Sequence, residues 1–124
     1  MQYFHNGQIM DMKIRSKVWI TVDGEPVFGR GRRFLLEAID KHGSINQAAK
    51  SINISYRKAW GYIRTMEQRL GFPLIERRTG GRNGGGATLT EKARDFLRKY
   101  NALEEGIREI VDDRFNAVFR AGDV

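Results

Sequence analysis

The sequence contains no cysteine, and this absence excludes disulfide bonds and thiolate metal sites. It has only two histidines, His5 and His42, so histidine-based metal centres and nucleophile relays have little to draw on. No apolar run approaches the length that spans a bilayer, and the N-terminus lacks the basic start and apolar stretch of a signal peptide. We therefore expect a cytoplasmic chain without a membrane partner, long enough at 124 residues to bury a core.

The motifs of phosphate-binding enzymes are also missing. A Walker A loop ends in Gly-Lys-Ser/Thr, and residues 79–90 contain no lysine. Gly29 and Gly31 supply only the first two glycines of a dinucleotide fingerprint. The adjacent carboxylates Asp112 and Asp113 fall in a predicted terminal helix, where a solvated face is the ordinary role of such a pair. The sequence thus predicts no catalytic residue, no metal site and no cofactor, and we do not expect an enzyme.

Positive charge is concentrated in one part of the chain. The net charge is +7 and the isoelectric point is near 10.1. Residues 55–82 carry seven arginines and lysines against two glutamates, which accounts for five of the seven net charges. Such a cluster indicates a surface for a polyanion, although a solvated basic face without a partner gives the same pattern.

Two helices joined by a tight turn are predicted in the middle of the chain. Ser44 and Gln47 form a capping box ahead of a short helix, and Ser55 caps a longer helix over residues 56–70. Gly71 ends that helix, whose apolar residues recur at a spacing of 4, 3 and 4: Ala59, Ile63, Met66 and Leu70. Its outer face is basic and aromatic. This is a helix-turn-helix arrangement.

A hairpin and a first helix are predicted before this motif. Residues 14–22 alternate as a strand does, and Asp23-Gly24 is a strong hairpin turn signal before a short return strand through Phe28. A helix of about three turns then opens at Gly29-Arg30-Gly31 and ends at His42-Gly43. Its predicted apolar face consists of Phe34, Leu35, Ala38 and Ile39.

Residues 76–90, "ERRTGGRNGGGATLT", combine five glycines with three arginines. Three interpretations compete: a flexible linker, a phosphate-binding enzyme loop, and the basic finger of a nucleic-acid-binding protein. Strand-like residues 74–78 and 87–89 flank the tip, and the charge is unusual for a linker. Glycines let the backbone approach a phosphate and arginines supply forked donors, so the finger fits its neighbours best.

A helix of about 30 residues is predicted from the cap Thr90 to about Phe119. A heptad-like apolar seam on this helix predicts a dimer interface, formed by Phe96, Tyr100, Leu103, Ile107 and Ile110. The alternative is a helix broken near Gly106 that folds back on its own domain.

Residues 43–97 strongly resemble the DNA-binding domain of ModE-type molybdate-responsive regulators, most specifically in "ISYRKAW" and "TGGRNGGGATLT". "RTMEQRLGFPLIER" resembles, more distantly, the winged helix of LysR-type regulators. The resemblance implies a mainly α fold with small β-hairpins: a winged helix-turn-helix with an N-terminal hairpin and a long C-terminal dimerisation helix. It divides the chain into a leader over residues 1–12, whose order is left open, a DNA-binding domain over 13–89 and a dimerisation helix over 90–124.

By position, the resemblance implies double-stranded DNA and a second copy of the chain as partners, and a nucleoid-associated location. The implied recognition-helix contacts are Ser55, Tyr56, Arg57, Lys58, Trp60 and Arg64. The implied wing contacts are Arg77, Arg78, Thr79, Gly80, Gly81, Arg82, Asn83 and Gly84. Trp60 is equally suited to a structural role beside the preceding helix.

One departure from the ModE pattern affects the expected function. The chain ends at Val124, so we expect no oxyanion-binding domain, and any effector would act through a separate protein or not at all. The sequence predicts a sequence-specific transcriptional regulator, with molybdate- or tungstate-related genes as candidate targets. The alternatives are an architectural DNA-binding protein with little base preference and an interaction module that docks an acidic protein.

Overall fold

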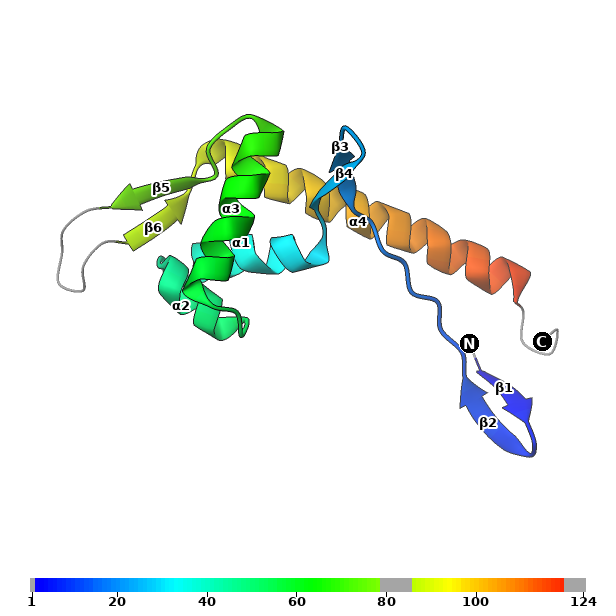
Figure 1. The fold of residues 1–124 in the computed structure, drawn as a ribbon. Helices are drawn as coiled ribbons and strands as arrows, with labels where there is room; N and C mark the ends of the chain where they lie inside the picture. The colour runs from blue at the N-terminus through cyan, green and yellow to red at the C-terminus, as the bar shows by residue number, and fades with distance from the viewer. Residues whose placement is uncertain (1, 79–85, 120–124) are drawn as a thin grey trace. The chain divides into compact units, whose positions relative to one another are not determined.

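The computed structural model describes residues 2–78 and 86–119, and the chain divides into two compact units (Figure 1). The larger unit is Val18–Tyr100, and the smaller unit is Met1–Lys17 with Asn101–Val124. Helix α4 (Glu91–Val118) begins in the larger unit and ends in the smaller one. The predicted division into leader, DNA-binding domain and dimerisation helix places its boundaries elsewhere, and it stays a prediction.

The larger unit is mainly helical and contains two antiparallel hairpins. Its elements before α4 are β3 (Ile20–Val22), β4 (Glu25–Phe28), α1 (Arg30–His42), α2 (Ile45–Ser51), α3 (Tyr56–Leu70), β5 (Ile75–Arg78) and β6 (Gly86–Leu89). Strand β3 pairs with β4, and β5 pairs with β6. This order of elements confirms the predicted winged helix-turn-helix fold.

The first of these hairpins is shorter than the alternation in the sequence predicts. Asp23 and Gly24 have φ values of 51° and 80°, so the predicted turn is confirmed. The strand predicted over residues 14–22 covers only Ile20–Val22, however. A strand needs a hydrogen-bonding partner, and β4 ends its ladder where Phe28 pairs with Ile20. Residues 14–19 therefore lie outside the ladder, although their residues alternate as those of a strand do.

The core of the larger unit is built around aromatic rings and the inner faces of the helices. The Phe28 ring lies edge-on to Phe96 and to Tyr100, with ring centroids 4.9 and 4.8 Å apart. Helix α1 buries Leu35, Ala38 and Ile39 as predicted. Phe34 was predicted on the same face, but it is 46% exposed and Leu36 is buried instead. Around the helix axis, Phe34 lies just outside the arc that the buried residues occupy.

The start of β6 fits closely against the turn after α1, and a glycine makes this possible. The Ala87 amide donates to the Gly43 carbonyl at 2.9 Å, and a Cβ on Gly86 would lie 3.0 Å from the same oxygen. We expect Gly86→Ala to lower the free energy of unfolding by about 1–3 kcal/mol because the backbones must separate. Gly31→Ala is the matched control, since a Cβ there meets no atom and alanine favours a helix. Equal urea midpoints for the two variants would contradict this packing.

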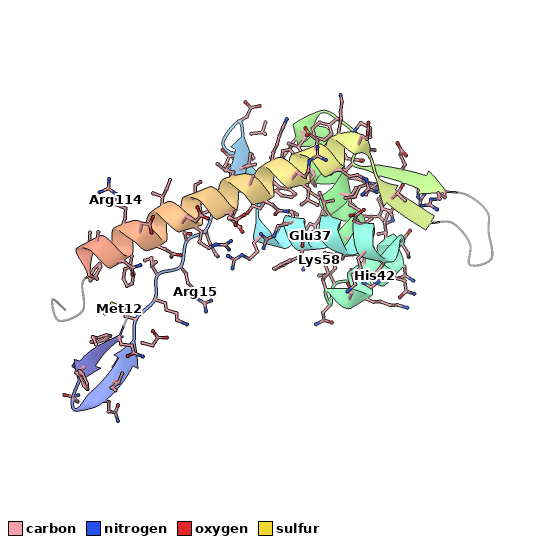
Figure 2. The ribbon with its side chains drawn as sticks, turned by 180° about the vertical axis from the view of Figure 1, so that it is seen from behind. Met12, Arg15, Glu37, His42, Lys58 and Arg114 are labelled. Atoms are coloured by element: carbon pink, nitrogen blue, oxygen red, sulfur yellow. The ribbon has the colours of Figure 1, made fainter. Side chains whose placement is uncertain are left out.

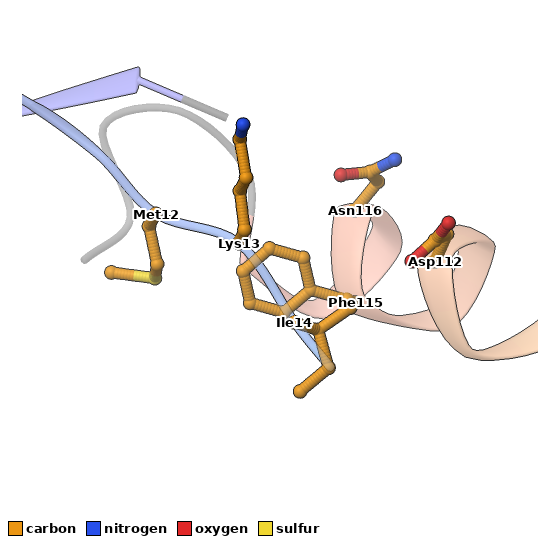
Figure 3. A pocket seen from close by; sticks show the side chains of 6 residues that line it. All are labelled: Met12, Lys13, Ile14, Asp112, Phe115 and Asn116. Carbon is orange, nitrogen blue, oxygen red and sulfur yellow. The ribbon is translucent and has the colours of Figure 1, made fainter. Parts of the chain in front are cut away.

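The smaller unit contains a hairpin within the residues predicted as a leader. Strands β1 (Gln2–His5) and β2 (Gln8–Asp11) pair through a turn at Asn6 and Gly7, whose φ values are 51° and 77°. The segment after β2 lies along the second part of α4. Six residues line a pocket there, as Figure 3 shows: Met12, Lys13, Ile14, Asp112, Phe115 and Asn116. Residues 2–11 are thus regular structure rather than a loose leader.

Candidate nucleic-acid interface

Local hydrogen bonds at two serines position the helix-turn-helix. The Ser44 hydroxyl accepts from the Gln47 amide at 3.2 Å, and the Ser55 hydroxyl accepts from the Lys58 amide at 3.0 Å. Both predicted N-caps are therefore confirmed. Between the helices, Asn53 adopts a left-handed φ of 61°, a conformation that asparagine tolerates better than most residues. These features fix where α3 begins.

Helix α3 presents one buried and one exposed face. Ala59, Ile63 and Met66 are fully buried, as their spacing predicts. On the other side, five of the six predicted recognition-helix residues are exposed: Ser55, Tyr56, Arg57, Lys58 and Arg64. Figure 2 labels Lys58, which lies in the first turn of the helix. The exposed face carries the donors and acceptors that base edges and phosphates require.

Trp60, the sixth predicted residue, is half-buried and joins α3 to the wing strand β5. The Arg77 guanidinium lies 4.7 Å from the Trp60 ring centroid, and its Nη2 donates to the Tyr56 hydroxyl at 3.4 Å. The Tyr56 ring is edge-on to Trp60 at 6.3 Å. Trp60 also packs against the core, so both roles considered for it from the sequence have a structural basis. We call Tyr56, Trp60 and Arg77 the wing-side flank of α3.

A second cluster of cations and an aromatic ring lies on the other side of α3. The Arg32 guanidinium carbon of α1 is 3.5 Å from the centroid of the Tyr62 ring, and the Lys58 ammonium is 5.9 Å from it. We call Arg32, Lys58 and Tyr62 the α1-side flank. Arg32 and Tyr62 are not predictable as site residues from the sequence, because no local pattern relates a residue of α1 to one of α3.

Hydrogen bonds anchor the base of the wing. A Glu67 carboxylate oxygen accepts from the Leu74 amide at 2.7 Å, where the chain leaves α3. The Thr90 hydroxyl donates to the Pro73 carbonyl at 2.7 Å and accepts from the Ala93 amide at 3.1 Å, which confirms Thr90 as the cap of α4. Because these bonds join both ends of the hairpin, β5 and β6 are held in place beside α3.

The predicted wing contacts are only partly within the described residues. Arg77 and Arg78 are exposed on β5 and pair with Ala87 and Gly86 of β6. The other predicted wing residues, which lie outside the described residues, are Thr79, Gly80, Gly81, Arg82, Asn83 and Gly84.

Three cations of α4, Arg94, Arg98 and Lys99, have carboxylate partners. Arg94 pairs with Asp40, and hydrogen bonds from Lys99 and Arg98 lower the pKa of Asp95. By contrast, several cations near α3 form no ion pair with any carboxylate of residues 2–78 and 86–119: Arg32, Arg57, Lys58, Arg64, Arg77 and Arg78. Their charge is therefore available to an external anion.

The five residues predicted for the dimer seam are not equivalent. Tyr100 is 1% exposed and Phe96 is half-buried, both within the core of the larger unit. Tyr100 also donates to the Val18 carbonyl at 2.7 Å. Of the others, Leu103 and Ile110 are 49% and 63% exposed, and Ile107 is half-buried. The surface of Tyr100 is thus already covered within one chain, and the seam of the five residues stays a prediction.

The described part of the chain offers no sign of two other kinds of site. Within residues 2–78 and 86–119, no three histidine, aspartate or glutamate side chains gather as metal ligands would. The helices of this same part are too short or too polar to cross a bilayer.

Comparison with known proteins finds similarity over the central part of the chain. Residues 34–94 match the bacterial regulatory helix-turn-helix proteins of the lysR family. A crystal structure of a CbnR_DBD–DNA complex is similar in fold, with a TM-score of 0.55 at 21% sequence identity, and the match covers 72% of this chain and 97% of that chain.

Two curated relatives are similar over the same region. The molybdenum transport protein ModE of Azotobacter vinelandii is 44% identical over 93 residues, which are 73% of this chain and 34% of that protein. The transcriptional regulator ModE of Haemophilus influenzae is 49% identical over 70 residues, which are 56% of this chain and 28% of that protein. The chain thus spans about a third of the length of these relatives.

Proposed function

We propose that the chain is a sequence-specific, DNA-binding transcriptional regulator, and the match of residues 34–94 to the bacterial regulatory helix-turn-helix proteins of the lysR family supports this proposal. The observation that carries the proposal is the exposed face of α3, whose cations lack carboxylate partners among the described residues and lie beside an anchored wing. The family is one of DNA-binding regulators, and we propose no catalytic activity and a cytoplasmic, nucleoid-associated location.

In this proposal α3 enters the major groove of double-stranded DNA. Its first residues, Ser55, Tyr56 and Arg57, lie nearest the base edges, as the N-terminal residues of a recognition helix do. Arg77 and Arg78 of the wing hold the phosphate backbone.

We further propose that two copies of the chain pair through the second part of α4. Leu103, Ile107 and Ile110 follow one another at spacings of 4 and 3 and are at least partly exposed, so an apolar stripe lacks cover in a single chain. A two-fold pair is the simplest way to cover it and would match a palindromic site. A monomeric mass by light scattering at micromolar concentration would contradict this pairing.

The relatives named for molybdenum suggest which genes to test first. We propose genes for molybdenum or tungsten uptake as targets.

The test is fluorescence anisotropy of the purified chain with DNA from its own upstream region and with a scrambled duplex. We expect preference for the upstream fragment and roughly a thousandfold loss of affinity between 50 and 200 mM salt, if about six phosphates are neutralised. The same titration is repeated with molybdate present. Equal, steeply salt-dependent binding to both duplexes would favour an architectural protein. Absence of binding would favour an acidic protein partner.

A further inference from the structure

We propose that the α1-side flank of α3 is a second phosphate-binding site, in which Arg32 and Lys58 hold the DNA strand opposite to the one held by the wing. This inference rests on the proposed function, and it adds a residue of α1 to the interface. Its ligand is the phosphodiester backbone of a duplex, not a base.

The stacking of Arg32 prepares its guanidinium for such a ligand. The Arg32 guanidinium carbon lies over the Tyr62 ring, 3.5 Å from its centroid, which restricts the rotation of the group. A guanidinium stacked on an aromatic face can still use its in-plane N–H donors for an anion. Lys58 approaches the same ring at 5.9 Å, so two cations share one aromatic support. The first turn of α1 contains no acidic residue that would neutralise them.

The period of the helix places the two flanks on opposite sides of the exposed face. Each residue of an α-helix advances by about 100°, so Lys58 and Tyr62 lie about 200° from Tyr56 and Trp60 respectively. Arg57, Gly61 and Arg64 project between them. The exposed face of α3 is thus bordered by a cation–aromatic cluster on each side, the wing with Arg77 on one and α1 with Arg32 on the other.

The dimensions of B-DNA give this arrangement a function. The major groove is about 12 Å wide, and a helix with its side chains is about 10–12 Å across, so a helix in the groove has a phosphate row on each side. A cation on only one flank would hold one row. Cations on both flanks hold the two rows and fix how the helix is rotated in the groove, which is the positioning role of phosphate contacts.

The first test compares Arg32→Ala with Arg98→Ala in the complete chain. Arg98→Ala is a matched control, because it removes the same charge from the larger unit. Unlike Arg32, Arg98 is paired with a carboxylate, that of Asp95. We expect Arg32→Ala to weaken binding to specific and scrambled duplexes alike, roughly tenfold at about 0.1 M salt, and to flatten the salt slope by about one unit. Arg98→Ala should leave both quantities nearly unchanged.

A second test assigns the strand and separates binding from folding. A neutral methylphosphonate is placed at one phosphate at a time along each DNA strand. The unsubstituted chain should bind more weakly when the replaced phosphate is one that Arg32 contacts, or one that Arg77 contacts. Arg32→Ala should become insensitive to methylphosphonates only at the phosphates that Arg32 contacts, and Arg77→Ala only at those that Arg77 contacts. Tyr62→Phe should keep the affinity and Tyr62→Leu should reduce it, with unfolding midpoints measured in parallel.

The outcomes are distinguishable. Specific binding by the unsubstituted chain, with equal affinities and salt slopes for Arg32→Ala and Arg98→Ala, would overturn the second site and leave the proposed function intact. A lowered unfolding midpoint with an unchanged salt slope would overturn it too, since Arg32 would then be structural. If the unsubstituted chain binds no duplex, both proposals are wrong.

Discussion

Replacing Arg57 with alanine should reduce the preference for the cognate DNA site by about 1–3 kcal/mol, or roughly 5- to 150-fold. Arg57 is exposed in the first turn of α3, next to the cap Ser55, and forms no ion pair with a carboxylate of the described residues. A guanidinium at this place in a recognition helix is suited to bidentate contact with a guanine edge. Its loss removes a contact that a scrambled duplex does not offer.

Two control variants separate base recognition from charge. Arg57→Lys keeps the positive charge but loses the planar fork, so it should lose most of the preference and retain the salt slope. Arg78→Ala removes a charge from the wing, so it should weaken cognate and scrambled duplexes equally and flatten the slope by about one unit. Competition anisotropy with both duplexes measures all three variants. If Arg57→Ala and Arg78→Ala behave alike, this division of roles is wrong.

The sequence predicts the interface well wherever the determinants are local. The caps at Ser44 and Ser55 depend on hydrogen bonds to an amide three residues away, and the buried face of α3 depends on helical spacing. These are interactions within one turn of chain. The glycine stop at Gly71, with a φ of 83°, is equally local.

The flanks of α3 are not predictable in this way. The contacts of Arg32 with Tyr62 and of Arg77 with Trp60 join separate elements, and their partners depend on how those elements pack. The same limit applies to the apolar face of α4. Its heptad spacing continues through Tyr100, but the spacing does not tell which apolar residues face the chain's own core and which remain exposed.

The hairpin of residues 2–11 is a different case, because its signal is present in the sequence. Asn6-Gly7 is the same kind of turn signal as Asp23-Gly24, and both pairs adopt positive φ values. The flanking strands "QYFH" and "QIMD" lack a regular alternation. Among residues 2–11, every side chain except that of Tyr3 is exposed. A turn signal without a buried face predicts a hairpin but gives no reason for it to pack.

The two parts of α4 should respond to substitution in opposite ways. Tyr100→Ala should lower the free energy of unfolding by about 3–5 kcal/mol, because it opens a cavity beside Phe28 and leaves the Val18 carbonyl without its hydroxyl donor. Since these contacts lie within one chain, the loss should be the same at low and high protein concentration. Tyr100→Phe, which keeps the ring, should lose only about 0.5–1.5 kcal/mol.

Ile110→Ser is the matched variant on the exposed part of the helix. Ile110 is 63% exposed in the single chain, so its loss should cost little within one copy but should weaken a pair of copies that covers it. The urea midpoint of a dimer rises with protein concentration by mass action, and Ile110→Ser should reduce that rise while Tyr100→Ala should not. Light scattering at the same concentrations should give a smaller mean mass for Ile110→Ser. If Tyr100→Ala instead altered the concentration dependence, Tyr100 would belong to the seam after all, and the second part of α4 alone would not be the interface.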